Sequence, residues 1–289
     1  MTVTDRPSPT MGRVAYTAAW LRQNIYLVLG VLIVGAFIVV AVFAESLAPY
    51  GADEQNLLAA LEGPSAEHLV GTDALGRDLL SRVLIGTRHT LTVALTAVAI
   101  AVTAGITLGL VSGFVRGWSG RVIDAAVDIA LTIPMMVLAI AIAAVMGAGT
   151  IGLIIAISIS FTPPIARILR GRVLEIREED YVDAAVTLGV PAWKIMARHV
   201  LPNASTIVVI EASLQAGQAV LIATALGFLG LGVQPPTPEW GTLLGQGREY
   251  LQVAPYIVLS PGIAISLLVL GFNLLGDGLR DWLDPRVSG

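Results

Sequence analysis

The sequence predicts an all-α integral membrane protein with six transmembrane helices. Hydrophobic residues make up 55% of its 289 residues and charged residues only 13%, against about 25% charged residues in an average soluble domain. Apolar runs of about 19 residues or more recur along the chain, and as helices they are long enough to cross a hydrocarbon layer ~30 Å thick at 1.5 Å per residue. The longest inner connection between them, residues 169–203, is too short to fold as a catalytic domain.

The chain begins with a polar segment and a first apolar run. Residues 1–24 are predicted to be a cytoplasmic N-terminal segment, followed by a first transmembrane helix over 25–43. A cleaved signal peptide is the alternative for this run, but its apolar core would span only about 7–15 residues. Residues 44–90 are more polar and are predicted to form a periplasmic or extracellular segment.

Residues 91–289 are predicted to form a core of five further spans and a short cytoplasmic tail. Asp124 and Asp128 lie near the start of the second of these spans, and Pro163-Pro164 near the end of the third. The expected ranges are 91–115, 123–146, 150–168, 204–229 and 256–276.

Positively charged residues predict the orientation. With the N-terminus inside, 13 of the 17 Lys and Arg residues fall in inner segments, and the outer segments hold only Arg77, Arg82, Arg88 and Arg248. Inner loops of membrane proteins carry this excess of positive charge. The expectation is therefore a multi-pass protein of the inner or plasma membrane, in contact with lipid and with both termini in the cytoplasm.

Composition also excludes several functions. The chain has no Cys and three scattered His, so a thiolate metal site is excluded and a zinc site is not indicated. Its one lysine, Lys194, follows Trp rather than Gly, so no Walker A loop exists. A net charge of −4 argues against nucleic acid as a partner. No serine nucleophile with a neighbouring base is apparent, and the chain is not predicted to be an enzyme.

The stretch from Tyr181 to Asn203, inside by the charge count, has the local chemistry of a helix, a stop, a second short helix and another stop. Gly189 suits the left-handed residue that ends a helix, and Pro191 suits the first turn of the next. Pro202 is expected to interrupt the chain again, biasing Leu201 away from helical geometry. The prediction is a short helix lying crosswise between two long ones.

The same stretch resembles the "EAA" loop of ABC-importer permeases. Asp183-Ala184-Ala185 is followed after three residues by Gly189, and Leu201-Pro202 closes the pattern. The chain departs from that pattern with Asp for Glu at 183 and His for Ile at 199. The segments Gly71–Leu91, Phe228–Leu244 and Phe272–Arg286 resemble the peptide and nickel group of these permeases. The last of them resembles the C-type subunit of dipeptide and oligopeptide permeases.

The resemblance implies a type I ABC importer permease fold in which the loop forms a cytoplasmic coupling helix seated on an ATPase. The implied partners are a B-type permease subunit in a heterodimer, two ABC ATPases or one fused ATPase, and an extracytoplasmic substrate-binding protein. ATP and Mg²⁺ would be used by the ATPases, and this chain would bind no cofactor. The residues expected to couple are Asp183, Ala184, Ala185, Gly189, Pro191, Trp193, Met196, Arg198, Leu201 and Pro202.

Several alternatives remain open from the sequence. The 181–203 loop could instead be an amphipathic helix lying on lipid head groups, and the chain could be an ion-gradient-driven secondary transporter. The imported substrate could be a nickel chelate, glutathione or haem rather than a peptide. Glu211 and Asp128 could line the translocation pathway, or could pair within the protein. Gly105, Gly109 and Gly113 form a smooth helix face that could slide during transport or simply pack.

Overall fold

The structure is a computed structural model that describes residues 20–21, 23–115 and 117–283. Most of the predicted segment 1–24, Arg116 and the end of the predicted tail lie outside the described residues. The long helices are α2 (Ile25–Val42), α4 (Leu79–Phe114), α5 (Trp118–Leu131), α6 (Met135–Met146), α7 (Thr150–Arg177), α10 (Leu201–Phe228) and α12 (Tyr256–Leu283). The short elements are α3 (Ala44–Leu47), η1 (Leu57–Ala59), α8 (Asp180–Thr187), α9 (Ala192–Ile195), η2 (Met196–Val200), α11 (Trp240–Gly247) and η3 (Arg248–Tyr250).

The predicted all-α class is confirmed, with five to six candidate spans. Five helices are long and apolar enough to cross a membrane, and the pair α5 and α6, bent by 94°, makes six if it is counted as one span. The sequence analysis expected one straight helix over 123–146. The chain breaks there because Pro134 has no N–H and precedes α6 in an extended conformation, with ψ of 128°.

Helices α4, α7 and α12 extend beyond the predicted spans, and α12 ends at Leu283 rather than at residue 276. The helix predicted at 91–115 begins at Leu79, where the Asp78 carboxylate accepts a hydrogen bond from the Ser81 N–H at 2.8 Å and caps its first turn. The helix predicted at 150–168 continues through Pro163-Pro164 to Arg177. Hydropathy locates the apolar part of a helix, whereas its ends depend on caps that polar residues supply.

The expected break at Pro202 is wrong. Residues Ala192–Phe228 run as one helix of 37 residues, and Leu201 is helical, with φ −61° and ψ −44°. The π-helical turn η2 lets the Leu201 N–H bond to the Met196 carbonyl, five residues back. This wider turn accommodates a proline that would otherwise clash with a carbonyl in the preceding turn. The short helix is therefore the first part of a long one.

Helices α4 and α7 pack against each other along the glycine face of α4. A Cβ added to Gly109 would lie 2.8 Å from the Ala166 carbonyl oxygen, and one added to Gly105 would lie 2.6 Å from Ile165. Gly113 meets Val173 in the same way. Small residues at this spacing let two backbones approach closely, and the glycine face of α4 packs on α7 of the same chain.

A second close helix contact was not predicted from the sequence. Helix α2 packs against α12, where a Cβ on Gly30 would collide with the backbone of Leu275 and one on Gly278 with that of Leu27. Gly30 and Gly278 lie near opposite ends of the sequence. Only the fold shows that they face each other.

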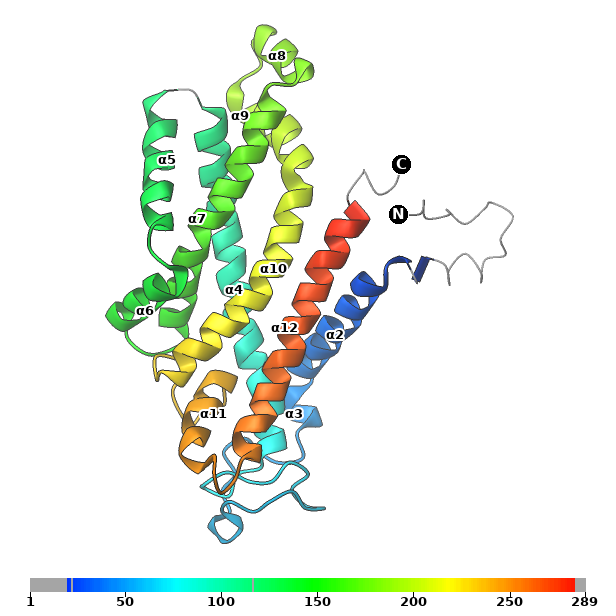
Figure 1. Cartoon of the computed structure of the whole chain (residues 1–289), viewed down its shortest axis with the longest axis vertical. Coiled ribbons are helices and arrows are strands. Elements are labelled where there is room, and N and C mark those ends of the chain that lie inside the picture. Colours follow the sequence, from blue (N-terminus) through cyan, green and yellow to red (C-terminus); the bar gives the residue numbers. More distant parts are fainter. Residues whose placement is uncertain (1–19, 22, 116, 284–289) are drawn as a thin grey trace, which may run out of the picture.

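The end of the molecule that carries α11 is built from the segment after α3 and from the connection between α10 and α12 (Figure 1). The Glu239 side chain is buried and caps α11 by accepting bonds from the N–H groups of Gly241 and Thr242. Burial raises the pKa of Glu239, and the hydrogen bonds from Gly241, Thr242 and Thr90 oppose that shift. The contact with Thr90 attaches α11 to α4.

Candidate functional site

The 181–203 loop lies at the opposite end of the molecule from α11 (Figure 1). It consists of α8, a turn at Gly189, and the α9–η2 start of the long helix that continues as α10. Asp180 and Asp183 lie in the first turn of α8, where negative charge interacts favourably with the helix dipole.

Gly189 ends α8 in the way that the sequence predicted. Its φ is +74°, its N–H bonds to the Val186 carbonyl at 3.0 Å, and the Val190 N–H bonds to the Ala185 carbonyl at 3.1 Å. These two bonds define a Schellman motif, in which the left-handed residue is usually glycine. Pro191 then takes the capping position just before α9 rather than its first turn, and its carbonyl accepts from Lys194 and Ile195.

One face of the loop is anchored in a small core of its own. Val182, Ile195 and Val200 are almost fully buried, and they pack with Leu169, Val173 and Ile176 of α7. This cluster is separate from the main core between the spans. The loop is therefore seated firmly on the end of α7, and its geometry follows that helix.

The other face presents apolar side chains to the outside. Leu188 is 81% exposed and Trp193 is 68% exposed, and Asp183, Ala184 and Arg198 are exposed beside them. Met196 is only half exposed and packs against the buried cluster. Trp193 and Met196 are the large apolar side chains among the residues expected to couple, and of the two Trp193 is the one exposed to a partner.

Polar side chains that the sequence analysis did not single out fasten the loop together. The Asn203 amide donates to the Tyr181 hydroxyl at 3.3 Å, and the Tyr181 and His199 rings lie 6.2 Å apart. The Arg177 guanidinium donates to the Gly113 carbonyl at 3.2 Å, which joins the ends of α4 and α7. The spacing of Tyr181 and Asn203 carries no local signal, because they meet only after the chain reverses at Gly189.

The two candidate pathway carboxylates differ in their surroundings. Asp128 on α5 pairs with Arg167 on α7, while neighbouring Asp124 pairs with Arg170 at 2.9 Å. Glu211 on α10 is half-buried and makes no hydrogen bond or ion pair with any described residue. Asp128 thus has the partner within the protein that the alternative expected, and Glu211 stays a prediction for the pathway.

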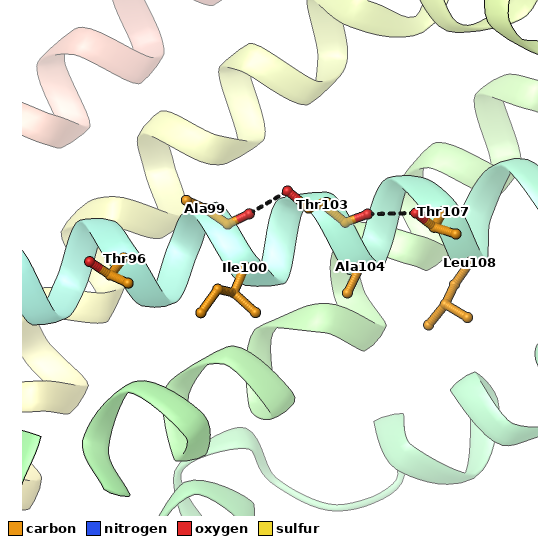
Figure 2. A pocket seen from close by; sticks show the side chains of 7 residues that line it. All are labelled: Thr96, Ala99, Ile100, Thr103, Ala104, Thr107 and Leu108. Carbon is orange, nitrogen blue, oxygen red and sulfur yellow. Dashed lines mark hydrogen bonds between the residues drawn. The ribbon is translucent and has the colours of Figure 1, made fainter. Parts of the chain in front are cut away.

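A hollow of about 640 Å³ lies along one side of α4 (Figure 2). The Thr103 hydroxyl donates to the Ala99 carbonyl at 2.8 Å, and the Thr107 hydroxyl to the Thr103 carbonyl at 2.9 Å. Their donors are therefore used within the helix, while the hydroxyl oxygens can still accept. The hollow offers a mostly apolar surface with a few acceptors, lined by Thr96, Ala99, Ile100, Thr103, Ala104, Thr107 and Leu108.

The described residues hold no group of three or more His, Asp or Glu side chains placed to bind a metal ion. What the structure does offer is a bundle of spans with a rigid, partly apolar loop at one end. Residues 105–289 match the family of binding-protein-dependent transport system inner membrane components. The chain belongs to this family. Residues 17–64 also match the N-terminal transmembrane domain of oligopeptide transport permease C.

Relatives agree with this assignment, and a solved structure shares the fold. The chain is 43% identical over 268 residues to the dipeptide transport system permease protein DppC of Alkalihalophilus pseudofirmus, covering 93% of this chain and 88% of the relative. It is 40% identical over 270 residues to the glutathione transport system permease protein GsiD of Pectobacterium atrosepticum, covering 93% and 89%. A chain of the inward-facing MetNI methionine ABC transporter superposes with a TM-score of 0.58 at 20% identity, over 71% of this chain and 98% of that one.

This chain is therefore a multi-pass, C-type permease subunit of an ABC importer and not an enzyme. An importer of this kind works with ATPase partners, which supply the ATP hydrolysis. The family assignment decides against the ion-gradient-driven alternative. It does not by itself assign roles to the loop residues or the carboxylates.

Proposed function

We propose that this permease forms half of the translocation pathway of a peptide importer, as a heterodimer with a B-type permease subunit. Two ATPase subunits, or one fused ATPase, bind at the 181–203 loops, and a substrate-binding protein delivers the peptide from the other side. The names of the dipeptide and glutathione permeases that the chain resembles support a small peptide as substrate. Uptake of di-, tetra- and octapeptides and of glutathione by the reconstituted complex would identify it.

The exposed face of the 181–203 loop, called the coupling loop below, is the observation that carries this proposal. Leu188 and Trp193 are large apolar side chains left open at the end of a loop whose other face is tightly packed. Exposed aromatic side chains surrounded by charge are typical of interface anchors. The loop continues directly into α10, so a displacement of the loop by an ATPase moves a membrane-spanning helix as a rigid body.

The proposed orientation places both termini and the 181–203 loop in the cytoplasm. Because the chain contains no Cys, single cysteines can be introduced at Leu58, which is 100% exposed, and at Leu188. In intact cells a membrane-impermeant maleimide is expected to label Leu58→Cys, and to label Leu188→Cys only after permeabilisation. Labelling of Leu188→Cys from outside would refute the orientation.

Truncation of the exposed tryptophan tests the coupling role. Trp193→Ala is expected to lower the affinity of the permease pair for the ATPase by about ten-fold or more, as loss of a central aromatic anchor does. The measurement is ATPase retained on affinity-purified permease, together with peptide uptake. Trp118→Ala is the matched control, because Trp118 is also exposed, at the start of α5 and outside the loop. Equal retention of ATPase in both variants would count against the coupling assignment.

A further inference from the structure

A second pocket lies at the end of the molecule opposite the coupling loop. It has a volume of about 360 Å³ and is formed where residues 73–79 face α11, η3 and the start of α12. Its polar lining residues are Asp73, Arg77, Gln246, Glu249 and Tyr250. The proposed orientation puts this pocket on the outer face of the membrane.

A buried arginine with unused donors lies in this pocket. Arg77 is 6% exposed, and its Nε donates to the Asp73 carboxylate at 2.7 Å. Neither Nη atom hydrogen-bonds to a described residue, and neither is sealed from solvent. Arginine presents its donors in a planar fork that matches a carboxylate, so the guanidinium retains the capacity to bind one.

Two neighbouring carboxylates, Asp73 and Asp78, are already engaged, and the third, Glu249, is exposed and makes no hydrogen bond or ion pair with Arg77. One oxygen of Asp73 accepts hydrogen bonds from the backbone N–H groups of Leu75 and Arg77, and the other accepts from the Arg77 side chain. The Arg82 Nε also lies 3.6 Å from that second oxygen. Asp78 is engaged by His68 and by the first turn of α4. Both groups are occupied in holding the segment together.

The surface around the pocket combines exposed apolar side chains with exposed charged ones, among them Asp53, Glu54 and Glu249. Leu75 lines the pocket, and Gly76 approaches the Asn56 carbonyl so closely that a Cβ would collide with it, which brings η1 beside the pocket. Exposed apolar side chains flank it on the η1 side and after Tyr250, namely Leu57, Leu58, Leu251 and Val253. An apolar rim around a desolvated charged position is the arrangement of a protein interface hot spot.

We propose that this pocket receives an aspartate or glutamate side chain of the substrate-binding protein, whose carboxylate pairs with Arg77 while its surroundings cover the exposed leucines. This inference rests on the proposed function, and it names the contact by which the binding protein is held. A free peptide carboxylate would use Arg77 but would leave the apolar rim uncovered. The rim therefore favours a protein partner.

The test uses the complete transporter in lipid nanodiscs, titrated with its purified substrate-binding protein. Arg77→Gln is expected to raise the Kd by about ten-fold or more, because a buried charge loses its partner. Gln246→Trp, which fills the pocket and leaves the Asp73–Arg77 pair intact, is expected to raise it similarly. Glu249→Gln is expected to lower the Kd about two-fold, since it removes an exposed like charge from the rim.

Arg248→Gln is the matched control, because Arg248 is an exposed arginine that lies over the Phe228 ring and outside the pocket. Its Kd is expected to be that of the wild type. An unchanged Kd in both Arg77→Gln and Gln246→Trp would overturn the inference, as would a change in Arg77→Gln alone. If the two pocket variants keep the wild-type Kd for the binding protein but are no longer stabilised by phosphatidylglycerol, the pocket binds lipid instead. If they keep that Kd but have a raised KM for peptide, the pocket binds the transported peptide instead. If the wild-type complex does not bind the substrate-binding protein at all, the proposed function itself is refuted.

Discussion

Replacing Gly189 with valine is expected to uncouple the permease from its ATPases. Gly189 has φ of +74°, and this left-handed conformation costs a residue with a Cβ roughly 1–2 kcal/mol and is a genuine outlier for a β-branched side chain. Loss of the turn would release the carbonyls of Ala185 and Val186 and redirect the chain that carries Trp193. Peptide uptake is expected to fall by about ten-fold or more, with the permease still inserted in the membrane.

The Gly189→Val substitution is informative because its effect comes from the backbone conformation and not from a steric clash of the new Cβ. No atom lies within 4 Å of the position that a Cβ on Gly189 would take, so the backbone conformation alone decides the effect. Gly189→Asn is the matched control, since asparagine adopts the left-handed region more readily than other residues with a side chain. Uptake is expected to be largely retained in Gly189→Asn. Equal loss in both variants would show that the left-handed turn is not what coupling requires.

Adding a single methyl group at Gly109 is expected to destabilise the subunit. The new Cβ would lie 2.8 Å from the Ala166 carbonyl oxygen and 3.0 Å from the Leu169 Cβ, so α4 and α7 must move apart along their whole contact. Overpacking of a tight contact costs about 1–3 kcal/mol, and Gly109→Leu is expected to cost more than Gly109→Ala. The measurement is the thermal unfolding midpoint of the purified protein in detergent.

Gly171→Ala on α7 is the matched control, because it adds the same methyl group outside the contact between α4 and α7. A Cβ there would have no neighbour within 4 Å, and alanine in a helix is favoured over glycine by roughly 0.5–1 kcal/mol. Gly171→Ala is therefore expected to leave the unfolding midpoint unchanged or slightly raised. A midpoint for Gly109→Ala that matches it would mean that α4 and α7 do not pack as closely as the structure shows.

Local rules were sufficient wherever a feature depends on residues close together in the chain. The left-handed turn at Gly189 was predictable because a helix end needs a residue that tolerates positive φ. The same kind of rule failed at Pro202, because the sequence shows that an N–H is missing but not that a π-helical turn can absorb the loss. The bend between α5 and α6 was missed for a related reason: the hydropathy of 123–146 is continuous across Pro134.

The sequence by itself determined that this protein is an all-α membrane protein with a helix-ending turn at Gly189, because hydropathy and turn chemistry are properties of short stretches. The permease assignment came from the resemblance of the 181–203 pattern to the EAA loop. Only the tertiary structure decided which side chains of that loop face outward, that Asp128 is paired with Arg167, and that Arg77 keeps free donors in a pocket beside α11. Each of these depends on segments that are far apart in the chain and meet through packing. Contacts between distant segments depend on the shape and volume of whole helices, which no local sequence pattern encodes.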